Sequence, residues 1–254
     1  MYSIVMPVYN GKNYFESALR SAIASISNED EIIVVEDGSL DGGVSDIIKK
    51  YAKQAKIKYF IKNNGGVGSA LNFGIEKAEN PIFAWLSHDD IYLPNRFTSD
   101  RNLRVLIPDI ITVSNFYLYN QKDKKCMFIN STKKIGSRQK IKLLAYRFLN
   151  GNTITIPINI IKSFGGFDES LKHTQDYDLW CKVLKNYNLS AIANSTVISR
   201  QHIDQDSKKK PTEALREYKI LIRKNLTLKD VIDPRNFFRV LQIFYFLYLN
   251  QINL

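Results

Sequence analysis

The sequence predicts an α/β protein with a mainly parallel central sheet flanked by helices. In the first half of the chain, short apolar stretches alternate with amphipathic stretches of ten or more residues, which is the pattern of β-α-β units. Each apolar stretch ends in polar residues or glycine, as strands do before a crossover. The composition is that of a globular protein, with 44% hydrophobic and 24% charged residues over 254 positions. A chain of this length can bury a sizeable core.

Four strands are expected in the first half, at Tyr2–Met6, Glu31–Glu36, Ile57–Ile61 and Ile82–Leu86. The helices between them are expected at Tyr14–Ser27, Val44–Ala55 and Gly66–Ala78. Polar turns follow the strands, at Pro7–Asn10, Asp37–Ser39, Asn63–Gly66 and Ser87–Asp90. Because ligands bind at the carboxyl ends of parallel strands, we expect these four turns to form one binding rim.

The second half of the chain is less regular. Its expected elements are a strand at Ile110–Tyr119, a hairpin partner at Cys126–Ile129, a basic helix at Arg138–Leu149, a strand at Thr153–Pro157, a turn at Gly165–Asp168 and a helix at Asp176–Lys185. From Thr212 onward the pattern is helical and ends in the apolar run Phe237–Leu249. That run is shorter than the ~20 residues needed to span a bilayer, and Arg239 and Gln242 interrupt it.

Positive charge is concentrated in two segments. The formal net charge is +11, of which residues 121–147 contribute +8 and residues 207–254 contribute +6, leaving −3 for the remainder. Two basic patches on an acidic body favour a polyanionic partner, such as an anionic membrane or a nucleic acid. An aromatic apolar helix beside basic residues suits a membrane interface. The alternatives for that helix are packing on the protein's own core or on a second copy in a homodimer.

The N-terminus and the cysteines indicate a cytoplasmic protein. The chain enters an apolar strand directly, without the basic segment and apolar core of a signal peptide. Cys126 and Cys181 are too few for a disulfide framework or a thiolate metal site. We therefore expect a cytoplasmic protein that binds peripherally to the inner face of the plasma membrane.

The most informative motif lies at the end of the fourth expected strand. The apolar residues through Leu86 are followed by Asp89 and Asp90, and Pro94 then opens a helix-like segment. Paired carboxylates at the tip of a buried strand are a common way to hold a divalent cation over a ligand. The alternative is that one of the two aspartates caps the helix after Pro94.

Several motifs together resemble the inverting family-2 glycosyltransferases of the GT-A fold. The matching segments are Ser3–Asn10, Glu31–Gly42, Asn64–Asn72, Ser87–Asp90, Gly165–Asp168, Gln175–Trp180 and Arg200–His202. One such motif arises by chance, but this many in order do not. The resemblance implies a glycosyltransferase domain at 1–207, with a nucleotide-binding half at 1–107 and an acceptor-binding half at 108–207. Residues 208–254 lie outside it, as a basic, apolar helical extension.

The resemblance implies that the rim binds a nucleotide-sugar donor, by family habit a UDP-sugar. Pro7, Tyr9 and Asp37 are expected to hold the base, and an acceptor-only carboxylate suits the uracil N–H. Gly66 belongs to a loop that lets the backbone approach the nucleotide, which Asp89 also contacts. The alternative for the aspartate-glycine-serine segment after the second strand is a simple β-turn.

The resemblance also implies a metal and a general base. Asp90 and Asp89 are expected to hold Mn²⁺ or Mg²⁺ between the two phosphates, and His202 completes the site. A lone histidine is otherwise a surface residue. Asp176 is expected to take the proton of the acceptor hydroxyl during one inverting displacement. The alternative places Asp176 as the cap of its own helix, and Asp178 is the competing candidate for the base.

Three residues depart from the family pattern without removing a required group. Glu36 and Ser87 stand where aspartates are usual, and Gln175 stands where glutamate is common. The implied acceptor is a glycan or a lipid-linked sugar used in cell-surface polysaccharide synthesis.

Two other functions fit the sequence less well. A nucleotidyltransferase or dehydrogenase needs a glycine-rich phosphate loop after the first strand, and none is present there. An RNA-binding module needs aromatic residues interleaved with basic ones, whereas the aromatics here gather in an apolar helix. We therefore expect no nucleic-acid partner.

Overall fold

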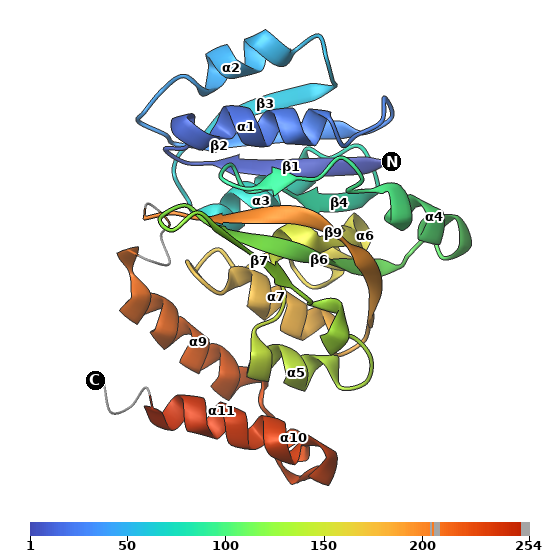
Figure 1. The fold of residues 1–254 in the computed structure, drawn as a ribbon, viewed down its shortest axis with the longest axis vertical. Helices are drawn as coiled ribbons and strands as arrows, with labels where there is room; N and C mark the ends of the chain where they lie inside the picture. Colours follow the sequence, from blue (N-terminus) through green and yellow to red (C-terminus); the bar gives the residue numbers. More distant parts are fainter. Residues whose placement is uncertain (204, 206–208, 250–254) are drawn as a thin grey trace.

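The structure is a computed structural model that describes residues 1–203, 205 and 209–249. Its centre is a nine-stranded sheet in the order β3-β2-β1-β4-β8-β6-β9-β5, with β7 paired to β6 (Figure 1). The strands are β1 (Tyr2–Val8), β2 (Glu31–Asp37), β3 (Ile57–Lys62), β4 (Ile82–Trp85), β5 (Ile91–Tyr92), β6 (Ile111–Asn120), β7 (Lys125–Ile129), β8 (Ile154–Pro157) and β9 (Leu189–Gln201).

Helices cover both faces of the sheet, and helices also make up most of the described residues after β9. The helices are α1 (Lys12–Ile23), α2 (Val44–Tyr51), α3 (Val67–Glu76), α4 (Thr98–Leu106), α5 (Gln139–Tyr146), α6 (Ile158–Ser163), α7 (Gln175–Val183), α9 (Pro211–Asn225), α10 (Leu228–Ile232) and α11 (Phe237–Leu249). Short 3-10 turns occur at η1 (Thr132–Lys134), η2 (Gly151–Thr153) and η3 (Pro234–Asn236). The strands and helices expected in the first half are confirmed, with the helices one to several residues shorter.

Strands β3, β2, β1 and β4 pair in parallel. Strands β1, β2 and β4 are buried on both faces, whereas the edge strand β3 is only partly buried. Alternate residues of β1 and β2 enter two separate hydrophobic clusters. Val5 and Ile33 face the cluster that includes α3, whereas Ile4 and Ile32 face the cluster that includes α1 and α2. This two-sided burial explains why these strands read as continuous apolar runs in the sequence.

The second half of the sheet is mixed. Strand β8 pairs antiparallel with β4 and β6, β6 pairs parallel with β9, and β9 pairs antiparallel with β5. The parallel pairing expected for the sheet therefore holds for β1 to β4, and the rest of the sheet is mixed. Strand β9 was not expected, because its pairing with β6 shifts register around Asn115. That irregularity spaces its buried residues Leu189, Ile192 and Val197 unevenly, so the period of two is lost.

The described part of the C-terminal segment packs on the second half of the chain. Tyr218 and Leu221 of α9, with Ile243 of α11, belong to the same hydrophobic cluster as Leu179 and Trp180 of α7. Helix α9 runs alongside α7 and α5, and α10 and α11 lie beyond them, at the end of the molecule farthest from α2 (Figure 1). The expected domain boundary at 207/208 lies outside the described residues.

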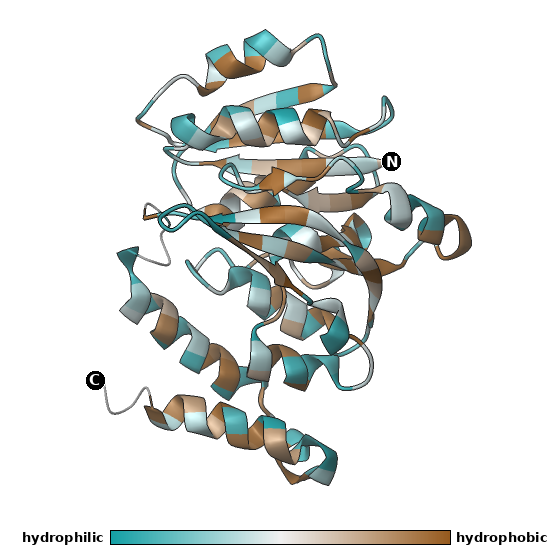
Figure 2. Ribbon diagram, viewed as in Figure 1, coloured by the Kyte–Doolittle hydropathy of each residue, from teal (hydrophilic) through white to brown (hydrophobic). Residues whose placement is uncertain are grey.

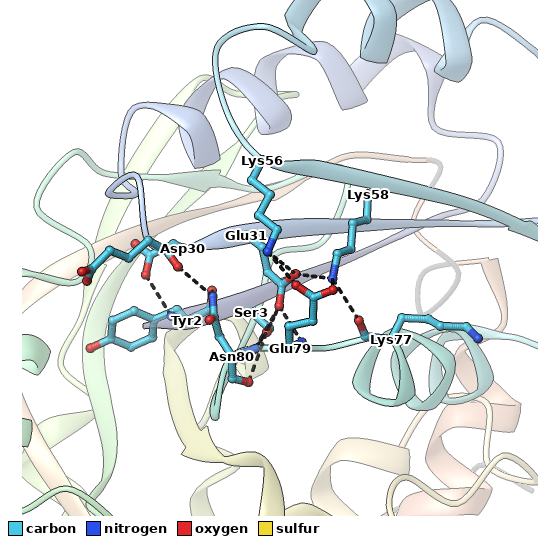
Figure 3. A network of polar contacts seen from close by, with 10 residues as sticks. Tyr2, Ser3, Asp30, Glu31, Lys56, Lys58, Lys77, Glu79 and Asn80 are labelled. Carbon is cyan, nitrogen blue, oxygen red and sulfur yellow. Dashed lines mark hydrogen bonds and ion pairs between the residues drawn. The ribbon is translucent and has the colours of Figure 1, made fainter.

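A buried carboxylate joins the amino ends of the parallel strands, at the edge opposite the expected binding rim (Figure 3). Glu31 is fully buried and accepts hydrogen bonds from the amides of Glu79 at 2.7 Å and Asn80 at 3.0 Å. It also accepts a hydrogen bond from the Ser3 hydroxyl at 2.7 Å and pairs with Lys58 at 2.7 Å. Burial opposes ionisation, but the Lys58 and Ser3 hydrogen bonds outweigh it and lower the pKa of Glu31.

We predict that Glu31→Ala lowers the free energy of unfolding by about 3–5 kcal/mol, because it breaks a buried ion pair and leaves two amides without an acceptor. Urea denaturation followed by tryptophan fluorescence measures this change. Glu79→Ala is the matched control, since Glu79 pairs with the same lysine but its side chain is 60% exposed. Equal shifts of the two unfolding midpoints would contradict the role given to Glu31.

Candidate active site

The four turns expected to form one rim contact each other. The Asn10 amide donates to Ser39 Oγ at 3.1 Å, and the Leu40 amide donates to Asn10 Oδ1 at 2.8 Å. The half-buried His88 imidazole is hydrogen-bonded to the backbone of Pro7. The turns after β1, β2 and β4 are therefore joined directly. The turn after β3 is connected to them through Asp37.

Asp37 organises the glycine loop. Its carboxylate accepts hydrogen bonds from the amides of Gly65 at 2.9 Å and Gly66 at 2.7 Å, and from Lys62 Nζ at 2.8 Å. Gly38 has a φ of +71°, and a Cβ there would lie 2.8 Å from the Asn64 amide nitrogen, so the turn requires glycine. Asp37 is 2% exposed and keeps unused lone pairs that can accept a ligand N–H.

The two aspartates after β4 have different partners. Asp89 Oδ2 lies 2.9 Å from His202 Nε2, and the His202 ring stacks on Tyr14 with centroids 4.3 Å apart. Burial opposes ionisation of Asp89, but the His202 hydrogen bond and the nearby imidazoles outweigh it and lower the pKa of Asp89. The structure thus brings together Asp89 and His202, which are 113 residues apart in the chain.

Asp90 points into the protein and is 4% exposed. Its carboxylate accepts hydrogen bonds from the Arg200 amide at 2.8 Å and from the Asn152 side chain. Burial, together with the charge of Asp89, raises the pKa of Asp90. Helix α4 begins only at Thr98, so the alternative that Asp89 or Asp90 caps it is wrong.

Asn152 was not expected to contribute to the site. Its Oδ1 accepts a hydrogen bond from the Ser87 amide at 3.0 Å, while its side-chain nitrogen donates to Asp90. Arg200 belongs to a motif recognised in the sequence, but the contact of its amide with Asp90 depends on the unexpected strand β9. An asparagine in an irregular segment carries no periodic or motif signal by which sequence reasoning could have found it.

Asp176 lies in the first turn of α7, and Thr174 is the N-cap residue of that helix. The alternative that Asp176 is the cap is therefore wrong. Its Oδ1 accepts a hydrogen bond from the Tyr177 amide at 2.8 Å, and burial raises the pKa of Asp176 to about 6. A carboxylate that ionises near neutral pH is suited to accept a proton during a reaction.

Asp178, the competing candidate for the base, is instead buried and paired with lysines. It is 1% exposed and forms ion pairs with Lys182 at 2.7 Å and Lys224 at 2.9 Å. These two lysines occupy its oxygens inside the protein, whereas no lysine pairs with Asp176 among the described residues. The geometry therefore favours Asp176 over Asp178 as a proton acceptor.

The segment before Asp176 lies beside the glycine loop. Lys172 Nζ donates to the Gly65 carbonyl at 3.2 Å. Asn72 of α3 exchanges two hydrogen bonds of 2.9 Å with the backbone of Phe167. The expected nucleotide-binding half and the expected base are thus held together by direct contacts. Tyr9, 43% exposed, lies at the solvent edge of this rim, and Pro7 is buried beneath it.

The donor set at Asp89 fits a divalent ion that is only partly held by protein. Neighbouring ligands of an octahedral ion with bonds of about 2.1 Å lie about 3.0 Å apart, close to the Asp89–His202 spacing. Among the described residues, no cluster of three or more histidine, cysteine or acidic side chains could hold a metal alone. Phosphate oxygens of a bound nucleotide and water would supply the remaining ligands.

Polar turns that meet at the carboxyl ends of parallel strands are where α/β enzymes bind their ligands. A family model described as glycosyl transferase family 2 matches residues 3–144, more than half of the chain. The protein belongs to glycosyl transferase family 2.

Relatives with similar sequences carry the same description. An uncharacterized glycosyltransferase of Rickettsia typhi is 38% identical over 241 residues, covering 91% of this chain and 74% of the relative. A Rickettsia felis relative is 38% identical over 215 residues, but the chain spans only 35% of its length. The Escherichia coli protein named UDP-Gal:alpha-D-GlcNAc-diphosphoundecaprenol beta-1,3-galactosyltransferase is 27% identical over 195 residues, covering 73% of this chain and 68% of that protein.

Solved structures confirm the fold. Staphylococcus aureus TarS residues 1–349, in complex with UDP, superposes with a TM-score of 0.69 at 17% identity, covering 97% of this chain and 70% of TarS. GalNAc-T7 with UDP, GalNAc and Mn²⁺ superposes with a TM-score of 0.66 at 15% identity, covering 88% of this chain and 47% of that chain. At these identities the likeness establishes the GT-A architecture alone.

Proposed function

We propose that this enzyme is an inverting, metal-dependent glycosyltransferase that moves a sugar from a UDP-sugar to a hydroxyl of a glycan or lipid-linked acceptor in cell-surface polysaccharide synthesis. The observation that carries the proposal is the position of Asp176. This carboxylate ionises near neutral pH, and the segment that leads to it contacts the loop that Asp37 organises, through Lys172 and Gly65.

The proposed donor site uses the rim residues predicted from the sequence. Asp37 accepts the uracil N–H, Pro7 and Tyr9 flank the base, and the backbone at Gly66 approaches the nucleotide. An exposed tyrosine ring such as Tyr9 offers a flat apolar surface to a base. The E. coli relative named for UDP-Gal and the TarS complex with UDP support UDP as the nucleotide.

The proposed metal site consists of Asp89 and His202. A divalent ion bound there would offset the negative charge that develops on the leaving diphosphate. The imidazole favours Mn²⁺ over Mg²⁺, and Mn²⁺ is present in the GalNAc-T7 structure. Asp90 was predicted as a direct ligand, but ligation would compete with its hydrogen bonds to Arg200 and Asn152. We therefore assign Asp90 to holding the turn that presents Asp89.

In the proposed reaction, Asp176 accepts the proton of the acceptor hydroxyl as that oxygen attacks the anomeric carbon. The new carbon–oxygen bond forms as the bond to the diphosphate oxygen breaks, and the nucleoside diphosphate leaves with the electron pair. A single displacement inverts the anomeric centre, so an α-linked donor gives a β-linked product.

We predict that nucleotide release from one of UDP-glucose, UDP-galactose or UDP-N-acetylglucosamine requires Mn²⁺, and that GDP-mannose is turned over more slowly. Asp89→Asn should lower Mn²⁺ affinity in the presence of UDP by about 100-fold, the upper range for losing a metal-site partner. Asp90→Asn is the matched control. We expect it to lower the thermal midpoint of unfolding and to change the Mn²⁺ affinity less than Asp89→Asn does. Full turnover in the presence of a metal chelator would contradict the assignment. A larger loss of Mn²⁺ affinity in Asp90→Asn than in Asp89→Asn would also contradict it.

The role of Asp176 predicts a pH dependence. The base must be ionised, so kcat should be constant above its pKa of about 6 and fall as pH decreases below it. Asp176→Asn should lower kcat by about 10²–10⁴ and remove this acid limb, while UDP affinity stays unchanged. Steady-state rates and UDP titrations between pH 5 and 8 measure both. Loss of UDP affinity with normal kcat would show that the residue binds the donor instead.

The C-terminal helices support a proposed contact with an anionic membrane. Phe238, Tyr245 and Tyr248 of α11 are 80%, 63% and 62% exposed, and apolar residues recur along this helix (Figure 2). A groove of about 610 Å³ is lined by side chains of α9 and α11, namely Thr212, Leu215, Arg216, Lys219, Ile220, Arg223 and Leu247. No described helix is both long and apolar enough to cross a bilayer. Lys208, one of the predicted flanking cations, lies outside the described residues.

We predict that the protein sediments with anionic phosphatidylglycerol vesicles and not with neutral phosphatidylcholine vesicles. The double variant Phe238→Glu, Tyr248→Glu should weaken this partitioning at least about tenfold, because each buried aromatic ring contributes about 1.5–3 kcal/mol. Leu106→Glu is the control, since Leu106 is 79% exposed on α4, away from the C-terminal helices. Equal partitioning of both variants would leave α11 as a surface for a second copy of the chain.

A further inference from the structure

A glutamate on α9 holds the backbone that leads into α7. The Glu217 carboxylate accepts hydrogen bonds from three consecutive amides, those of Lys172 at 3.0 Å, His173 at 2.9 Å and Thr174 at 3.1 Å. It also accepts one from the Thr174 hydroxyl at 3.2 Å. One side chain thus satisfies a run of backbone donors 43–45 residues away in the sequence.

These donors need an external acceptor. The amide of Thr174, the N-cap of α7, has no partner within the helix, and Lys172 and His173 lie on the segment that leads into it. Thr174 also makes no capping hydrogen bond with its own side chain. A carboxylate at this end is also favoured by the helix dipole. Because Asp176 follows Thr174 by two residues, the position of Thr174 determines where the Asp176 carboxylate lies.

Helix α9 is held firmly enough to fix that position. The next residue, Tyr218, is 2% exposed and donates its hydroxyl hydrogen to the Leu144 carbonyl at 2.6 Å. Two turns later, Lys224 pairs with Asp178 of α7 at 2.9 Å. The guanidinium of Arg147, at the end of α5, lies 4.5 Å from the Tyr218 ring centroid. Contacts on either side of Glu217 therefore prevent its helix from shifting relative to α7.

We propose that Glu217 is a positioning residue for the catalytic base, so that α9, which lies outside residues 3–144 matched by the family model, completes the active site. This inference rests on the proposed role of Asp176. A carboxylate displaced by about 1 Å from a reacting hydroxyl can cost about 100-fold in rate, which is the size of effect that such a residue controls.

The test uses Glu217→Gln, which keeps the shape of the side chain but removes one acceptor oxygen and the charge. We expect kcat for UDP release from the preferred UDP-sugar with Mn²⁺ to fall about 10- to 100-fold, with UDP affinity within about twofold of the wild type. Amides 172–174 should exchange hydrogen faster. Arg223→Gln is the control on the same helix and should leave kcat unchanged, because Arg223 is exposed and, among the described residues, has no hydrogen bond or ion pair to residues 172–176.

A second comparison separates positioning from a purely structural cap. In an Asp176→Asn background, Glu217→Gln should lower kcat by less than about twofold further, because the group it positions is already absent. A full additional loss in that background would overturn the inference, as would an unchanged kcat of Glu217→Gln with faster amide exchange. Normal kcat in Asp176→Asn alone would instead remove the proposed base role, so the two failures are distinguishable.

Discussion

The active-site rim depends on how strand β9 holds two adjacent carboxylates apart. The Arg200 amide binds Asp90 inside the protein, and His202, just past the end of the strand, contacts Asp89, whose side chain is 15% exposed. Without this strand, two neighbouring aspartates would share one environment and their charges would repel each other. With it, Asp90 is hydrogen-bonded within the fold, and Asp89 is the one of the two that we propose as a metal ligand. The last strand of the domain thus determines the chemistry available at the end of β4.

Buried carboxylates elsewhere in the molecule follow the same physical rule. Glu31 and Asp37 each accept hydrogen bonds from amides and pair with a lysine, and both act as anchors for backbone segments. At Asp176 burial outweighs the backbone hydrogen bonds and raises its pKa to about 6. Burial also raises the pKa of Asp90, but Arg200 and Asn152 hold that carboxylate inside the protein. Of the two, Asp176 is the carboxylate suited to proton transfer.

The first half of the fold could be predicted because β1, β2 and β4 are parallel and buried on both faces, and such strands produce continuous apolar runs. Strand β9 could not, since its register shift against β6 removes the alternation that would reveal it. Asp89, Asp90 and His202 could be selected as one group from motifs, but which carboxylate faces the ligand depends on Asn152 and the β9 backbone. The contacts of Glu217 join distant segments through backbone amides, which carry no sequence signal.

The central claim is that Asp89 and His202, and not Asp90, hold a divalent ion at the nucleotide rim. Crystals of the protein grown with Mn²⁺ and UDP, measured at the manganese absorption edge, test it most directly. The account predicts one anomalous peak within bonding distance of Asp89 Oδ2 and His202 Nε2, with Asp90 still bound to Asn152 and the Arg200 amide. A peak coordinated by the Asp90 carboxylate, or one remote from both Asp89 and His202, would contradict it.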